Sequence, residues 1–130
     1  MTVRIRNNSV DSRDPYRLAG FWEQVTGLHE DPDDPNAPDD EEVALRSPDG
    51  SPALLFLRVP ESKAGKNRVH LDVVPTDRTR DEEVERLVAL GASQLDDRRR
   101  PDGTGWVVLA DPEGNEFCVE RSDGERAQAR

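Results

Sequence analysis

The amino-acid sequence predicts an α+β fold built from two tandem βαβββ modules. Two similar stretches lie 64 residues apart, one at Ser47–Gly50 and one at Asp111–Gly114. The same offset relates Gly27 to Gly91, so each half has a glycine that ends a helix and, later, a turn that precedes a strand. A duplicated unit usually cannot bury its apolar face alone. We therefore expect the two halves to pack together and to bind any ligand between them.

The first module covers about residues 3–60 and begins with an alternating pattern that predicts a strand over residues 3–10. Asp14 and Pro15 then form an N-cap signal, and the helix that follows ends at Gly27. Residues 43–45 and 53–57 predict a β-hairpin, and a weaker strand pattern lies at residues 28–29.

The second module covers about residues 66–120, after a polar connector at residues 60–66. A strand is expected over residues 69–74, and Thr79 with Glu82 forms a capping box for a helix that ends at Gly91. Residues 106–109 and 116–119 predict a second hairpin, with a weaker strand near residues 93–95. Residues 121–130 have too few apolar side chains to pack and predict a flexible tail.

Length and composition narrow the class of protein. A chain of 130 residues fits a single domain with one core. The sequence contains no apolar run long enough for a membrane span and no signal-type segment, which predicts a cytoplasmic protein without membrane contact. Its one cysteine, Cys118, cannot form an intramolecular disulfide.

The acidity of the chain is local. Eight acidic residues, three prolines and no basic residue lie between positions 30 and 42, so the rest of the chain carries only about −2 of the net charge of −10. This composition predicts a solvated loop, and the alternative is a lid that attracts a cationic ligand. Nucleic acid is not an expected partner, because phosphate binding needs a basic face and Arg98–Arg100 is only one short cluster in a loop.

Three motifs in order resemble one known superfamily. They are the helix start at 14–22, the stretch Asn67–Asp72, and the turn and strand Asp111–Cys118. Over about residues 3–120 the chain resembles the glyoxalase-like branch of the vicinal oxygen chelate superfamily, which includes bleomycin resistance proteins and dioxygenases. The resemblance implies mixed sheets that curl around a shared cleft, and a homodimer.

The resemblance also raises the question of a metal. Metal-using members carry His, Glu or Gln at four inward positions, one on the first and one on the last strand of each module. In this sequence those positions fall on Asn7, Leu54 (or Phe56), His70 and Cys118. Only His70 is a customary ligand, so we expect the ligand set to be largely lost and no metal to bind. The alternative is a divalent metal at His70, held with the neighbouring carboxylates Asp72, Glu120 and Asp11.

The leading functional expectation is a protein that binds a small organic molecule in the cleft between its two modules, with chemical transformation of that molecule as an open alternative. The chemistries that the resemblance implies are those of a lyase, an isomerase or a dioxygenase. The alternatives are a metal-free protein that sequesters a cationic drug, and a structural domain without a ligand. The expected cleft residues are Asn7, Leu54, Phe56, His70, Asp72, Trp106, Cys118 and Glu120.

Two of these residues have several possible roles. His70 lines the cleft or acts as a general base, because the imidazole pKa lies near neutrality. Cys118 is an inert buried thiol, or it pairs with His70, which would lower the pKa of the thiol and make it reactive.

Overall fold

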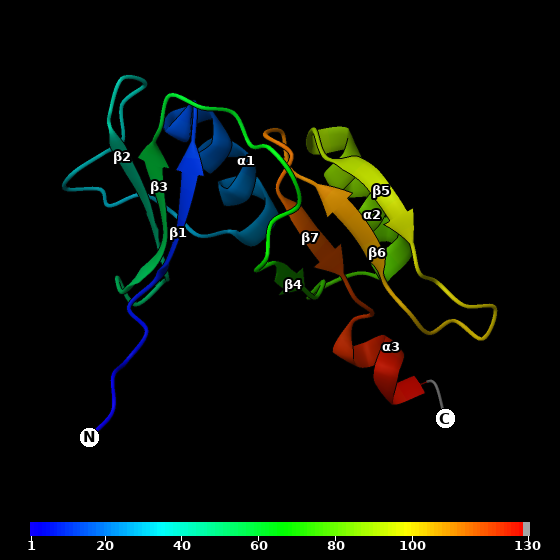
Figure 1. The fold of residues 1–130 in the computed structure, drawn as a ribbon. Coiled ribbons are helices and arrows are strands. Elements are labelled where there is room, and N and C mark those ends of the chain that lie inside the picture. The colour runs from blue at the N-terminus through cyan, green and yellow to red at the C-terminus, as the bar shows by residue number, and fades with distance from the viewer. Residues whose placement is uncertain (129–130) are drawn as a thin grey trace. The chain divides into compact units, whose positions relative to one another are not determined.

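The computed structural model describes residues 1–128, which form two compact units. Unit 1 is Met1–Ser62, and unit 2 begins at Lys63. The boundary lies within the polar connector at residues 60–66. Each unit contains a mixed β-sheet and a long helix, so the predicted α+β class is confirmed (Figure 1).

Unit 1 consists of one helix and a three-stranded sheet. Its elements are β1 (Asn8–Ser12), α1 (Pro15–Thr26), β2 (Glu42–Arg46) and β3 (Pro52–Arg58). The strand order is β1-β3-β2, with β1 parallel and β2 antiparallel to β3. The predicted hairpin of the first module is therefore present.

Helix α1 begins and ends where the sequence predicts. The carboxylate of Asp14 caps its first turn, and Gly27 ends it with a φ of 74°, which is favourable only for glycine. Leu18, Phe21 and Trp22 recur at helical spacing and are buried, with the two aromatic rings in an edge-to-face contact at 5.5 Å. This apolar stripe packs on the sheet of unit 1.

The sheet of unit 1 buries one face. Val43, Leu45, Leu54 and Phe56 are all at least 94% buried, and cross-strand pairing places them on the same side. Burial of each such side chain contributes about 1.5–3 kcal/mol. The register shifts at the end of β2, because Leu45 pairs with Leu54 but Arg46 pairs with Pro52, which leaves Ala53 as a β-bulge.

Two predictions for unit 1 require correction. The first strand begins at Asn8 rather than at residue 3, because Asn8 pairs with Leu54 and the residues before it would face first the bulged Ala53 and then Pro52, which has no N–H to donate. The weak strand at residues 28–29 is only an isolated bridge between His29 and Arg46.

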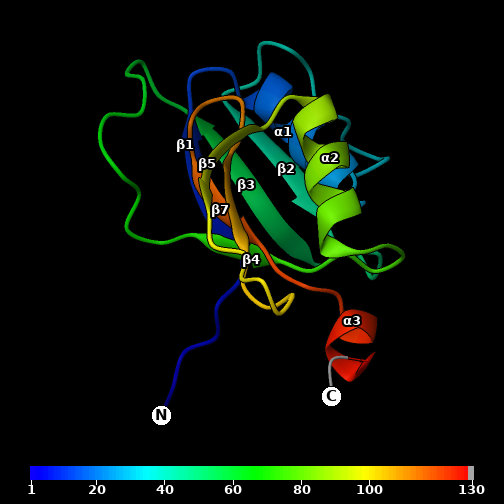
Figure 2. The same ribbon diagram turned by 90° about the vertical axis from the view of Figure 1, so that its right-hand side faces the viewer.

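Unit 2 contains a four-stranded sheet and two helices. Its elements are β4 (Leu71–Val73), α2 (Arg80–Leu90), β5 (Ser93–Asp97), β6 (Val107–Ala110), β7 (Glu116–Val119) and α3 (Asp123–Gln128). The strand order is β4-β7-β6-β5, with β4 parallel to β7 and the other pairs antiparallel. Figures 1 and 2 show α2 alongside this sheet.

Helix α2 has the predicted capping box, in which Thr79 and Glu82 bond to each other's backbone N–H groups. Val84 and Leu87 form its buried stripe. The sheet side chains that complete this core are at least 99% buried; they are Val107, Leu109, Phe117 and Val119.

The end of the chain differs from the predicted flexible tail. Residues 123–128 form α3, which buries no side chain. Its first turn has a local cap, since Ser122 accepts a hydrogen bond from the Glu125 N–H and the Glu125 carboxylate accepts one from the Ser122 N–H. The Glu125 carboxylate also accepts a bond from the Arg80 N–H, which links α3 to the start of α2. Residues 129 and 130 of the predicted tail lie outside the described residues.

No helix within residues 1–128 is both long enough and apolar enough to cross a bilayer.

Candidate functional site

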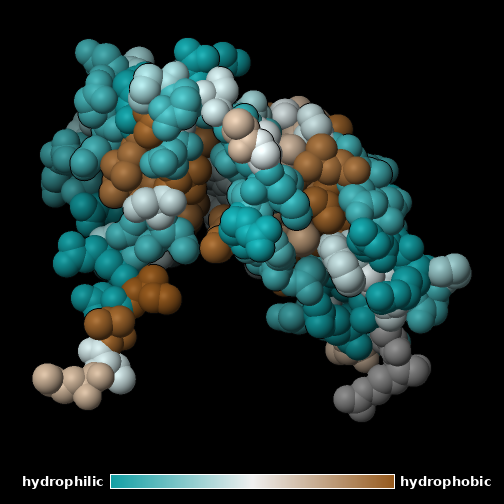
Figure 3. Space-filling view, in the orientation of Figure 1, coloured by the Kyte–Doolittle hydropathy of each residue, from teal (hydrophilic) through white to brown (hydrophobic). Residues whose placement is uncertain are grey.

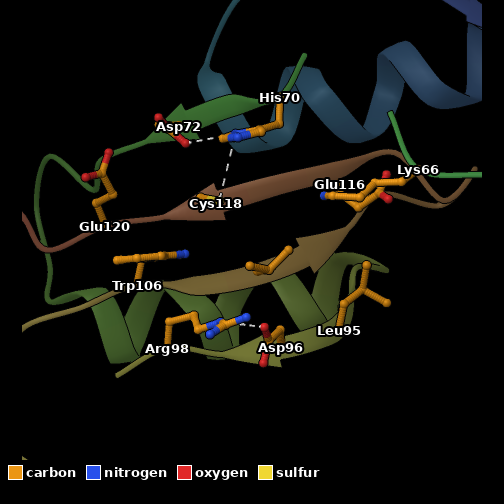
Figure 4. A pocket seen from close by; sticks show the side chains of 11 residues that line it. Lys66, His70, Asp72, Leu95, Asp96, Arg98, Trp106, Glu116, Cys118 and Glu120 are labelled. Carbon is orange, nitrogen blue, oxygen red and sulfur yellow. Dashed lines mark hydrogen bonds and ion pairs between the residues drawn. The ribbon is translucent and has the colours of Figure 1, made fainter. Parts of the chain in front are cut away.

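A pocket of about 590 Å³ lies on the sheet of unit 2 (Figure 4). Because side chains alternate along a strand, β6 and β7 bury Val107 and Phe117 on one face and direct Val108 and Cys118 to the other. The second face forms the floor of the pocket, and we call it the open face. The volume lies within the range of about 300–1,000 Å³ that is typical of small-molecule sites.

One wall of the pocket is apolar. It consists of Leu95 from β5, Val108 from β6, and Trp106, which directly precedes β6. Leu95 and Trp106 are 54% and 36% exposed, so both offer apolar surface to a ligand. Arg100 lies 5.8 Å from the centre of the Trp106 ring and orients it through a cation–π contact.

The other wall carries a cluster of three polar side chains, His70, Asp72 and Cys118 (Figure 4). Asp72 and Cys118 are register partners on β4 and β7, and His70 lies two residues before Asp72. The His70 Nδ1 atom is 3.2 Å from Asp72 Oδ1 and 3.9 Å from Cys118 Sγ. Strand pairing thus brings the three groups together.

Cys118 is not an activated nucleophile in this arrangement. Burial, the negative charge of Asp72 and, to a smaller extent, that of Glu120 together raise the pKa of its thiol to about 11. The thiol is therefore protonated at neutral pH. The predicted proximity of Cys118 and His70 is present, but it does not produce a thiolate.

Acidic groups outnumber basic groups around the pocket. The acids are Asp72, Asp96, Glu116 and Glu120, and the bases are Lys66 and Arg98. Three of the four carboxylates are paired with a basic side chain, since Arg98 bonds to Asp96 at 2.6 Å, Lys63 to Glu116 at 3.0 Å and Arg126 to Glu120 at 2.9 Å. Asp72 pairs instead with His70, so it is the carboxylate of this pocket that can attract a cationic group.

A buried arginine holds the loop that carries Trp106. Arg80 is only 5% exposed, and its guanidinium donates to the carbonyl oxygens of Gly103, Thr104 and Gly105 at 3.0–3.3 Å. Three carbonyl groups thereby bond to one fixed cation, which ties the loop to the first turn of α2.

The structure brings five of the predicted cleft residues to this pocket, namely His70, Asp72, Trp106, Cys118 and Glu120. His70 was expected within a strand but precedes β4. The reason is that the Asn67 side chain bonds to both the backbone N–H and the C=O of Glu116, so backbone pairing with β7 starts only at Leu71.

The other three predicted residues lie in unit 1. Asn7 is half-buried, precedes β1, and donates to Ser9, whereas Leu54 and Phe56 are buried on the face that packs against α1. Because Ala53 bulges, Leu55 rather than Leu54 occupies the position of β3 that corresponds to Cys118 of β7. A ligand contact by Asn7, Leu54 or Phe56 stays a prediction.

Sequence reasoning missed several pocket residues. Val108 and Glu116 have the same strand parity as Trp106 and Cys118, so strict alternation would have found them. Leu95, Asp96 and Arg98 were not identifiable, because β5 has a weak pattern with all five residues exposed. Lys66 lies in a connector whose path no local pattern predicts.

A helix that covers one face of a mixed sheet, with a pocket on the other, is the arrangement of a glyoxalase-like protein. The model of the glyoxalase-like domain family matches residues 8–120, and the chain belongs to this family. The resemblance found in the sequence is thereby confirmed. No curated protein matches the chain.

Solved structures share the fold. A glyoxalase/bleomycin resistance protein/dioxygenase family enzyme from Burkholderia phytofirmans PsJN has 20% identity and a TM-score of 0.66, over 88% of this chain and 94% of that one. The fosfomycin resistance protein FosX from Mesorhizobium loti has 19% identity and a TM-score of 0.67 over the whole of both chains. A FosX variant from Listeria monocytogenes, complexed with Mn(II) and 1S,2S-dihydroxypropylphosphonic acid, has 17% identity and a TM-score of 0.70, over 97% of this chain and 95% of that one. These identities establish similarity of fold.

The residues at the four metal positions of the superfamily do not fit a hard divalent ion. Leu55, which occupies the corresponding position of β3, has no lone pair to donate, and neither have the predicted Leu54 and Phe56, which are buried in the core of unit 1. Cys118 supplies sulfur where an oxygen ligand is expected, and Mn²⁺ or Mg²⁺ prefers oxygen. The four-position set therefore cannot hold such an ion in this chain.

Proposed function

We propose that this glyoxalase-like protein binds a small organic molecule in the pocket on the open face of unit 2. The observation that carries the proposal is the division of that pocket into an apolar wall at Leu95, Trp106 and Val108 and a polar wall at His70 and Asp72. Small-molecule sites combine these two features, because apolar surface supplies affinity and a few polar groups fix orientation.

The side chains of the two walls indicate the class of ligand that the pocket favours. An apolar or aromatic body fits against Trp106 and Val108, and a polar or cationic group fits near Asp72 and Glu120. The carboxylate of Asp72, whose partner is His70 rather than a lysine or an arginine, supports a cationic ligand over an anionic one. The same carboxylate supports sequestration of a cationic drug as the function of the site.

The proposal can be tested with two aromatic dyes of opposite charge. We expect the fluorescence of berberine, a cationic dye, to report tighter binding than that of anilinonaphthalene sulfonate, an anionic one. Val108→Phe fills the pocket and should weaken berberine binding at least tenfold. Val88→Phe is the matched control, because Val88 is 45% exposed on α2 and does not line the pocket.

The outcome of the control decides between specific and nonspecific binding. Equal affinities in the wild type and both variants would place the dye elsewhere and would contradict the proposal. Tighter binding of the anionic dye would contradict the inferred charge preference. Circular dichroism of each variant verifies that it is folded.

A further inference from the structure

We propose that His70, Asp72 and Cys118 form a three-ligand zinc site within unit 2. The inference names a cofactor for the pocket described above and rests on the same proposed function. The site shares His70 and Cys118 with the four-position set of the superfamily, but its third ligand is Asp72, which is not one of those positions, and all three ligands come from one unit.

The geometry of the cluster carries the proposal. One donor atom from each of the three residues can be chosen so that all lie within 4.8 Å of one another. Zinc bonds of about 2.0–2.3 Å in tetrahedral geometry place donor atoms about 3.3–3.7 Å apart. The His70–Asp72 and His70–Cys118 distances of 3.2 and 3.9 Å lie within a few tenths of an ångström of that range.

The donor types select the metal. One imidazole nitrogen, one carboxylate oxygen and one thiolate sulfur form a borderline-soft set that suits Zn²⁺ and disfavours Mg²⁺ and Mn²⁺. Binding requires loss of the thiol proton to solvent, and the Zn–S bond that forms compensates for that loss.

The solvent access of the three side chains and their number are also compatible with a zinc site. The side chains of His70 and Asp72 are 44% and 51% exposed, so an ion reaches them directly from solvent. Three protein ligands leave a fourth position, as in catalytic rather than structural zinc sites, and the ligands themselves line the pocket. Zinc bound there would polarise an oxygen atom of a ligand.

The experiment uses tag-free, full-length protein that has been treated with chelator and dialysed. Calorimetric titration with Zn²⁺ should show uptake of one ion per chain. Titration with Co²⁺ should produce the near-ultraviolet sulfur-to-cobalt charge-transfer absorption, which reports a thiolate ligand, and the chain has only one cysteine. This spectrum tests the proposal without any substitution.

Substitutions of single residues test which side chains are ligands of the zinc ion. Cys118→Ser should abolish the charge-transfer absorption, and Cys118→Ser, His70→Ala and Asp72→Asn should each weaken zinc binding at least tenfold. His29→Ala is the control for the other histidine, which lies beside the acidic segment of unit 1, and it should retain wild-type affinity.

Several results would overturn the zinc site. They are the absence of zinc uptake, a cobalt spectrum without a sulfur band, or a loss of binding in His29→Ala instead of His70→Ala. Binding of berberine to chelator-treated protein is measured in parallel. Dye binding without zinc uptake would refute the zinc site alone, whereas zinc uptake without dye binding would refute the proposed small-molecule function.

Discussion

Arg80 and Cys118 show how a single side chain can determine the properties of the pocket. Arg80 lies at the first position of α2, where its charge would normally face solvent, yet it is buried beneath the loop that carries Trp106. Cys118 is placed on the open face by strand alternation, and its surroundings keep it as a thiol. Neither environment can be read from the local sequence, because the partners are 20 to 50 residues away.

Replacement of Arg80 tests the loop attachment. Arg80→Met keeps the length of the side chain but leaves the carbonyl oxygens of Gly103, Thr104 and Gly105 without their charged donor. We expect the free energy of unfolding to fall by about 2–3 kcal/mol, measured by urea denaturation. Arg78→Met is the control, since among residues 1–128 the Arg78 side chain bonds only to the adjacent Asp77, and the substitution should have no measurable effect. Equal stability of the two variants would contradict this role.

The reactivity of Cys118 tests the electrostatics of the polar wall. In the presence of chelator, the rate of alkylation by iodoacetamide should rise with pH through a pKa of about 11 rather than the ordinary value of 9.0. Asp72→Asn removes a negative charge that disfavours the thiolate, so the pKa should fall and alkylation at intermediate pH should accelerate. An unchanged or slower rate in this variant would exclude Asp72 as a cause.

At the scale of elements, irregularities decide which residues reach the pocket. The bulge at Ala53 shifts the parity of β3, so that the helix-facing side chains are Leu54 and Phe56. Because the Asn67 side chain bonds to the backbone of Glu116, β4 begins only at Leu71, and His70 lies just before it. A pattern of alternating residues cannot reveal either feature, because each depends on a partner strand.

The loop between β5 and β6 provides a test at this scale. Gly103 and Gly105 both have positive φ angles, of 90° and 96°, but a Cβ at Gly105 would lie 2.0 Å from the carbonyl oxygen of Arg98, whereas one at Gly103 has nothing within 4 Å. Gly103→Ala should cost about 1–2 kcal/mol of stability. Gly105→Ala should cost more, about 3 kcal/mol or above, because the backbone must move. Thermal denaturation compares the two, and similar costs would contradict this close approach.

At the scale of the whole molecule, the duplication is visible in the strand register. The isolated bridge between His29 and Arg46 lies 64 residues before the pair of Ser93 and Ala110, the first pair of β5 and β6. Unit 1 therefore retains a trace of the strand that unit 2 forms in full. The acidic segment at residues 30–42 is not part of the repeat, since it occurs only in unit 1.

The prediction that belongs to the scale of the whole molecule is that the protein forms a homodimer. Hydrophobic surface is visible on the N-terminal segment and on parts of both units (Figure 3), and Val3, Ile5, Val69 and Leu95 are each more than half exposed. Burial of such surface favours association. Light scattering coupled to gel filtration should give twice the chain mass of 14.6 kDa. A single-chain mass that does not change with concentration would contradict the dimer.

The sequence alone determined the fold class, both long helices with their caps, the two hairpins and the family. These features follow from local signals such as the Thr79–Glu82 capping box and from the 64-residue offset. Only the tertiary structure decided that one pocket lies within unit 2 and that His70, Asp72 and Cys118 meet there. The physical reason is that the site depends on strand pairing between residues almost 50 positions apart, and a bulge or a delayed strand start changes that pairing without a local signal.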